Sequence, residues 1–173
     1  LIARARSLAD PTDSFLAASL ALEQGIAETR SGRNMIAART FEDALAAARA
    51  NGDPVLRVEA AIRYEDATWR PGLSGLDALT HLRDATSVLD TAVARGLVIE
   101  NEVELRVRLA IATLRALAMS GQADEVDAAF ADAQRLAAEL GSPTAEANAL
   151  SVYLGHVKYY EARTDTAPML ARL

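Results

Sequence analysis

Small and large apolar residues recur at helical spacing in three stretches of the chain, separated by glycine, proline and polar residues. In each stretch a large residue lies four positions after one small residue and three positions before another, so all three share one helix face. The sets are Ala37, Phe41, Ala44; Ala78, Leu82, Ala85; and Val126, Phe130, Ala133. Small residues let a neighbouring helix approach, and the large residue fills the space between helices. The pattern predicts packed helical hairpins.

Turn-forming residues divide the chain into these hairpins. Glycine and proline interrupt helices, and a polar side chain such as that of Asp13 or Ser14 can cap the helix that follows. A leading helix is expected to end at residues 9–11. Hairpins are expected over residues 13–52, 54–96 and 99–141, with inner turns at 31–34, 70–75 and 120–122, and an incomplete one over 143–173. About seven helices and an all-α fold follow.

The chain also resembles itself at an offset of 89 residues, the separation of Gly32 and Gly121. Glycine, proline and aromatic matches matter most, because such residues form turns or fill cores. The matches are Gly32 with Gly121, Phe41 with Phe130, Gly52 with Gly141, Pro54 with Pro143, and Tyr64 with Tyr153. Recurrence of this kind is typical of a repeat architecture. We expect residues 1–173 to form a single helical-repeat domain.

The hairpins resemble tetratricopeptide repeats. The resemblance rests on the small, large, small spacing and on a glycine five residues before the first small residue, at Gly32 and Gly121. The middle repeat departs from it, because Leu73 replaces the glycine and its turn is longer. The repeat length also exceeds the usual ~34 residues. The resemblance implies a superhelix of antiparallel hairpins with elongated helices.

Composition agrees with this fold, since alanine and straight side chains lose little entropy in a helix. The absence of cysteine excludes disulfides and thiolate metal sites. No apolar run is long enough for a membrane span and no signal-peptide pattern opens the chain, so we expect a cytoplasmic protein without membrane contact. Both ends resemble cuts through a longer protein. A cut end would expose an apolar face and allow self-association.

Charge and motif spacing argue against nucleic-acid binding and catalysis. A net charge of −6 does not favour direct contact with a phosphate backbone. His81 and His156 are far apart in sequence, and adjacent acids such as Glu65 and Asp66 diverge on a helix. A glycine-rich phosphate loop is absent. We expect no enzyme, no metal site and no cofactor in this fragment.

Residues 60–75, AAIRYEDATWRPGLSG, resemble a segment in the helical repeats of large bacterial ATP-binding transcriptional regulators of the LuxR-type, MalT-like class. In that class a nucleotide-binding domain, a repeat region and usually a helix-turn-helix domain share one chain. The resemblance therefore implies a regulatory repeat domain that receives an inducer or partner. In structural terms, Trp69 plugs the end of a hairpin beside Pro71. The alternative is that Tyr64, Glu65, Asp66 and Trp69 recognise a cationic ligand.

In tetratricopeptide-like stacks the first helix of each hairpin lines the concave surface, where partner peptides bind. This register predicts a groove formed by Arg30, Arg57, Tyr64, Arg108, Arg115, Tyr153 and His156. Guanidinium groups bind carboxylates and phosphates bidentately, which favours an acidic peptide or a small anionic inducer. The alternative is that the arginines pair with Glu59, Glu104 and Glu146 on exposed helix faces.

These observations lead to one expectation about function. The chain is expected to be a tetratricopeptide-like sensing or protein-interaction domain of a cytoplasmic bacterial transcriptional regulator, with a protein, peptide or small anionic inducer bound on its concave face. The alternative is a free-standing scaffold that joins proteins and has no link to transcription.

Overall fold

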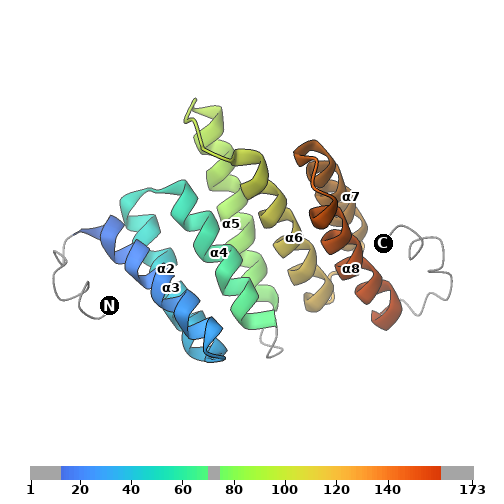
Figure 1. The fold of residues 1–173 in the computed structure, drawn as a ribbon, viewed down its shortest axis with the longest axis horizontal. Helices are drawn as coiled ribbons and strands as arrows, with labels where there is room; N and C mark the ends of the chain where they lie inside the picture. Colours follow the sequence, from blue (N-terminus) through green and yellow to red (C-terminus); the bar gives the residue numbers. More distant parts are fainter. Residues whose placement is uncertain (1–12, 70–74, 161–173) are drawn as a thin grey trace. The chain divides into compact units, whose positions relative to one another are not determined.

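The computed structural model describes residues 13–69 and 75–160, and within these ranges it contains seven α-helices and no strand (Figure 1). The helices are α2 (Ser14–Arg30), α3 (Asn34–Asn51), α4 (Pro54–Trp69), α5 (Gly75–Ala94), α6 (Glu102–Ser120), α7 (Ala123–Leu140) and α8 (Pro143–Tyr160). The predicted all-α fold is confirmed. The expected leading helix, the turn around Pro71 and the segment after Tyr160 lie outside the described residues.

The chain divides into two compact units, Leu1–Ile99 and Glu100–Leu173. Unit 1 holds α2 to α5 and unit 2 holds α6 to α8. The boundary coincides with the predicted start of the third hairpin at residue 99. The boundary between the units therefore falls between two hairpins. This is expected of a repeat fold, in which a hairpin is a structural unit.

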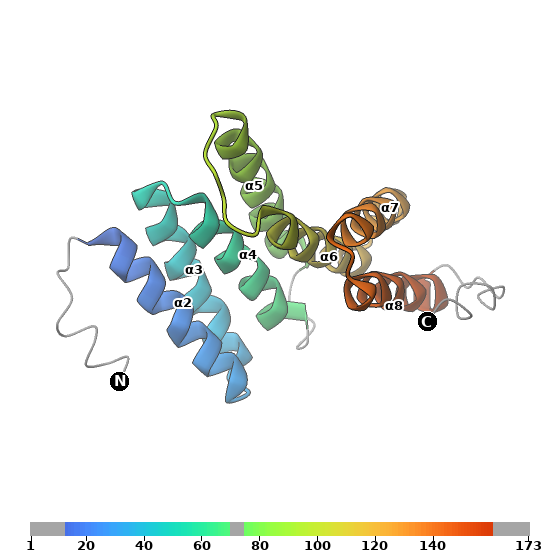
Figure 2. The same cartoon turned by 45° about the horizontal axis from the view of Figure 1, so that its top comes forward.

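In unit 1 the helices pack in chain order, α2 on α3, α3 on α4 and α4 on α5, and Figure 2 shows these four helices side by side. The predicted small, large, small faces of α3 and α5 form the contacts. Their residues are at most 1% exposed: Ala37, Phe41, Ala44, Ala78, Leu82 and Ala85. The spacing thus predicted correctly which face of each helix is buried.

One close approach joins α2 to α3. Gly25 on α2 is buried beneath the fully buried ring of Phe41 on α3. A Cβ atom added to Gly25 would lie 2.4 Å from Cε1 of that ring. Glycine at this position therefore lets the two helices pack around the phenylalanine.

In unit 2, α6 packs against α7 and α8, and α7 packs against α8. Val126 and Ala133 on α7 are fully buried. Phe130, between them, is partly exposed, and its ring stacks on that of Tyr153 from α8 with centroids 4.2 Å apart and planes inclined by 10°. The third predicted set therefore also packs against a neighbouring helix.

The turns before α4 and α8 are alike, as the offset of 89 residues predicts. Gly52 and Gly141 both adopt the left-handed conformation, with φ of 71° and 66°, which glycine reaches without strain. A side chain then caps the next helix: Asp53 Oδ1 accepts from the amides of Val55 and Leu56, and Ser142 Oγ accepts from that of Ala145. The sequence repeat thus reflects a repeated turn.

No helix among residues 13–69 and 75–160 combines the length and the apolar character needed to cross a membrane.

Candidate interaction surface

One face of α5 brings together charged, aromatic and apolar side chains at intervals of three and four residues, which place them in a row along the helix. We call this row the α5 face, and it consists of Asp77, His81, Asp84, Val88, Thr91 and Arg95. It lies beside the face that carries the buried residues Ala78, Leu82, Ala85 and Leu89. Side chains from α3 and α4 contact its central part.

An ion-pair cluster occupies the middle of the α5 face. Arg57 on α4 donates from Nε to Asp84 Oδ2 over 2.9 Å and from a terminal nitrogen to Oδ1 over 2.6 Å. Arg49 on α3 reaches the same carboxylate at 3.3 Å. Two guanidinium groups therefore share one carboxylate, so the cluster carries a net positive charge. Arg57 thus pairs with a carboxylate on another helix.

The same contacts set the ionisation of Asp84. Partial burial favours the neutral carboxyl, but hydrogen bonds from Arg57 and Arg49 outweigh it and lower the pKa of Asp84 below its ordinary value. The carboxylate is therefore ionised well below neutral pH and ties α3, α4 and α5 together.

Tyr64 and His81 form the next contact along the α5 face. Their rings meet edge to face, with centroids 4.9 Å apart and planes inclined by 82°. Burial, the charges of Glu42 and Asp77, and a hydrogen bond with Glu42 raise the pKa of the Tyr64 hydroxyl to about 12. Burial lowers the pKa of His81, and Arg49 adds to this effect, against the opposing influence of nearby carboxylates. Both rings are therefore neutral at physiological pH.

The other residues of the predicted groove lie in different surroundings. In unit 1, Arg30 is exposed at the end of α2. In unit 2, Arg108 and Arg115 are half-buried on α6, two turns apart. Arg57 and Tyr64 lie on α4 and contact Asp84 and His81 of the α5 face, while Tyr153 and His156 lie on α8. The partner-binding role of the arginines stays a prediction.

The predicted aromatic edge of the groove is buried within the units. Tyr64, Tyr153 and His156 are 6%, 5% and 2% exposed. The reason is packing between neighbouring helices: Tyr64 contacts His81 on α5, while Tyr153 stacks on Phe130 of α7 and donates its hydroxyl to Asp127 over 2.6 Å. These rings stabilise helix contacts and offer little surface to a partner.

The segment that resembles the regulators shows a similar pattern. Glu65 is 1% exposed, and Asp66 pairs with Arg63 on the same helix over 3.7 Å. Trp69 is partly exposed at the end of α4. With Tyr64 and Glu65 buried, the alternative cation site loses two of its four expected ligand-binding side chains.

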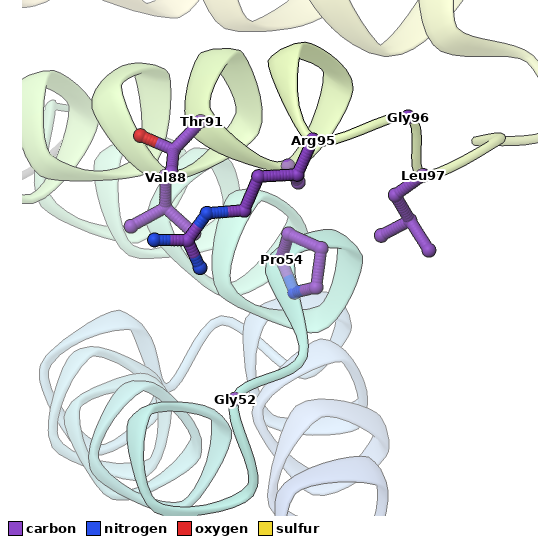
Figure 3. A pocket seen from close by; sticks show the side chains of 8 residues that line it. Gly52, Pro54, Val88, Thr91, Arg95, Gly96 and Leu97 are labelled. Carbon is purple, nitrogen blue, oxygen red and sulfur yellow. The ribbon is translucent and has the colours of Figure 1, made fainter.

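An open depression of about 590 Å³ lies at the C-terminal end of the α5 face, against the turn between α3 and α4. In Figure 3 the Arg95 side chain extends beside Val88 and above Pro54, and Leu97 lies on the other side of Pro54. The lining residues are Gly52, Pro54, Val88, Thr91, Ala92, Arg95, Gly96 and Leu97. The depression thus combines apolar walls with one cationic group.

Sequence reasoning missed this depression, because its residues come from two separate segments and carry no motif. The available signal was the periodicity along α5, where Val88, Thr91 and Arg95 follow Asp84 at helical spacing. That row leads from the ion-pair cluster through Val88 and Thr91 to Arg95, and these last three residues line the depression.

Within the described ranges no group of three histidine, aspartate or glutamate side chains has the arrangement of a metal site. No protein-family model, curated protein or solved structure matches the chain.

Proposed function

We propose that this chain is a partner-binding helical repeat that serves as the sensing or interaction module of a cytoplasmic bacterial transcriptional regulator. The observation that carries the binding role is the apolar depression at the end of α5. Leu97, which lines the depression, is 49% exposed, and the adjacent Val98 is 93% exposed. Apolar surface that adjoins a concave site marks an interaction site, because a partner that covers it removes that surface from water.

The polar residues of unit 1 support binding more than catalysis. Arg49, Arg57 and Asp84 are engaged with one another across three helices. The hydroxyl of Tyr64 is held by Glu42, and its raised pKa opposes a role as a base near neutral pH. These groups stabilise the packing that forms the depression, and the partner surface lies beyond them.

The link to transcription rests on residues 60–75, of which α4 contains the part up to Trp69. The sequence of the complete coding region tests this link. A phosphate-binding loop on the N-terminal side and a helix-turn-helix on the C-terminal side are expected for a regulator. If both are missing, the free-standing scaffold is the better account, and the binding role is unaffected.

Peptide-display selection on the folded, immobilised chain tests the binding role. Selected peptides are expected to bind the unmodified chain and to lose binding to Leu97→Asp. Leu76→Asp is the matched control, because Leu76 is 54% exposed at the N-terminal end of α5, whereas Leu97 follows its C-terminal end. Failure to enrich any peptide, or equal effects of the two substitutions, would contradict a binding site at the depression.

A further inference from the structure

We propose that the depression binds an acidic amphipathic peptide segment, with a peptide carboxylate at Arg95 and an apolar peptide side chain between Pro54 and Leu97. This inference deepens the proposed function and rests on it.

The charge around the depression is the first argument. Arg95 is exposed and forms no ion pair with any other described residue. Further along the same face, Arg49 and Arg57 share the single carboxylate of Asp84. The cluster and Arg95 together hold three cations and one anion, although the whole chain carries a net charge of −6. The described residues that line the depression include Arg95 and no acidic side chain, so the depression offers a cation to a partner.

The carboxylate of Asp53, in the turn before α4, does not cancel this charge. It accepts hydrogen bonds from the backbone amides of Val55 and Leu56 over 2.9 and 3.0 Å. A carboxylate in this position is paired with the positive end of the helix dipole. Arg95 is thus the cation left to meet an anionic group of a partner.

The apolar walls are the second argument. Pro54, Val88, Ala92 and Leu97 line the depression next to Arg95, and its volume of about 590 Å³ lies in the range of ligand sites. The guanidinium lies beside Val88, on one side of Pro54, and Leu97 lies on the other side (Figure 3). A ligand that fills this space must therefore present apolar and anionic groups side by side.

A peptide fits this combination better than a nucleic acid or a free anion. The lining contains no aromatic side chain on which a base could stack. A free anion would leave the apolar walls exposed to water. The adjoining side chain of Val98, which is 93% exposed, extends the apolar surface beyond the depression, as a longer ligand requires. An amphipathic segment places acidic and apolar side chains on adjacent positions of one face.

Fluorescence anisotropy with three synthetic peptides tests the inference. The first is a short labelled amphipathic peptide of leucine and glutamate, and the others carry glutamine or lysine in place of every glutamate. We expect the glutamate peptide to bind at least about tenfold more tightly than either, with an affinity that falls as salt is added. Arg95→Glu should weaken binding by about tenfold or more.

Arg39→Glu is the matched control, since it makes the same charge change at an exposed position of α3 and should alter binding less than about threefold. Equal binding of all three peptides, abolished by Leu97→Asp but unchanged by Arg95→Glu, would overturn the acidic partner while leaving the proposed function intact. Equal effects of Arg95→Glu and Arg39→Glu would also overturn it. Absence of binding by every peptide would contradict both this inference and a peptide site at the depression.

Discussion

Arg57 on α4 and Asp84 on α5 form a two-pronged ion pair, with donor to acceptor distances of 2.9 and 2.6 Å. Their side chains are 18% and 33% exposed, and Arg49 from α3 joins the same carboxylate. Such paired geometry is stronger than a single contact, because both guanidinium nitrogens are held. Together with Arg49, the pair connects three helices of unit 1 beside the proposed partner site.

Loss of the shared carboxylate should destabilise unit 1. Asp84→Asn is expected to lower the free energy of unfolding by about 1–2 kcal/mol, since it leaves two guanidinium groups without their anion. Urea denaturation followed by circular dichroism measures the change. Asp43→Asn, at an exposed position of α3, is the control and should cost less than about 0.5 kcal/mol. Equal effects of the two substitutions would show that the cluster does not hold the helices together.

Two glycines inside helices should respond to alanine in opposite directions. Gly25→Ala forces a methyl group to within 2.4 Å of the buried Phe41 ring, which is expected to cost about 1–3 kcal/mol. Gly155→Ala on α8 meets no described atom within 4 Å, so the better helix propensity of alanine should leave stability unchanged or raise it by up to about 1 kcal/mol. Thermal denaturation of both variants checks the contrast. A tolerated Gly25→Ala would contradict the close packing of α2 on α3.

His81 should make stability depend on pH in mildly acidic solution. Its pKa is lowered in the folded chain by burial and by Arg49, despite the nearby carboxylates of Glu42, Asp77 and Asp84. The unfolded chain therefore binds the proton more readily, and folding stability should fall as pH decreases from about 7 to 5. His81→Gln is expected to lose less stability over this interval, measured by urea denaturation. Identical losses would rule out the lowered pKa. Asp84 should contribute little to the stability change over this interval, because its pKa is lowered and it titrates at more acidic pH.

Tyr64 should make folding stability depend on pH in alkaline solution. Its hydroxyl has a pKa of about 12 in the folded chain, so the unfolded chain releases this proton first as pH rises above about 10. Stability should therefore fall between about pH 10 and 12. The fall should be smaller in Tyr64→Phe, which has no hydroxyl to ionise. Denaturation curves at pH 9 and just above pH 10 compare the two proteins, and equal slopes would contradict a buried, protonated hydroxyl.

The fold could be read from sequence to a large extent because its determinants are local. The spacing around Phe41 and Leu82 predicts the buried helix faces, and Gly52 with the following proline predicts a turn that the structure repeats at Gly141. Helix periodicity depends on residues a few positions apart, and such patterns are visible in one chain. The helix bounds differ from expectation by about one or two residues, as is usual at frayed ends.

The candidate site was harder to predict from the sequence, because the residues that form it lie far apart along the chain. Arg57 was recognised as a candidate, but its partner Asp84 is on another helix, and only packing of α4 on α5 joins them. Tyr64 shares a helix face with Arg57, yet its ring is buried against His81. The depression arises where the turn at Pro54 meets the end of α5, and no local pattern encodes that contact.

The central claim is that a partner binds at the C-terminal end of the α5 face, and backbone amide chemical shifts measured by NMR test it most directly. On addition of the leucine and glutamate peptide, the account predicts saturable shifts at Val88, Thr91, Arg95 and Leu97, with little change at Arg39 or Leu76. Saturable shifts centred elsewhere in the chain, with none at these four residues, would contradict it.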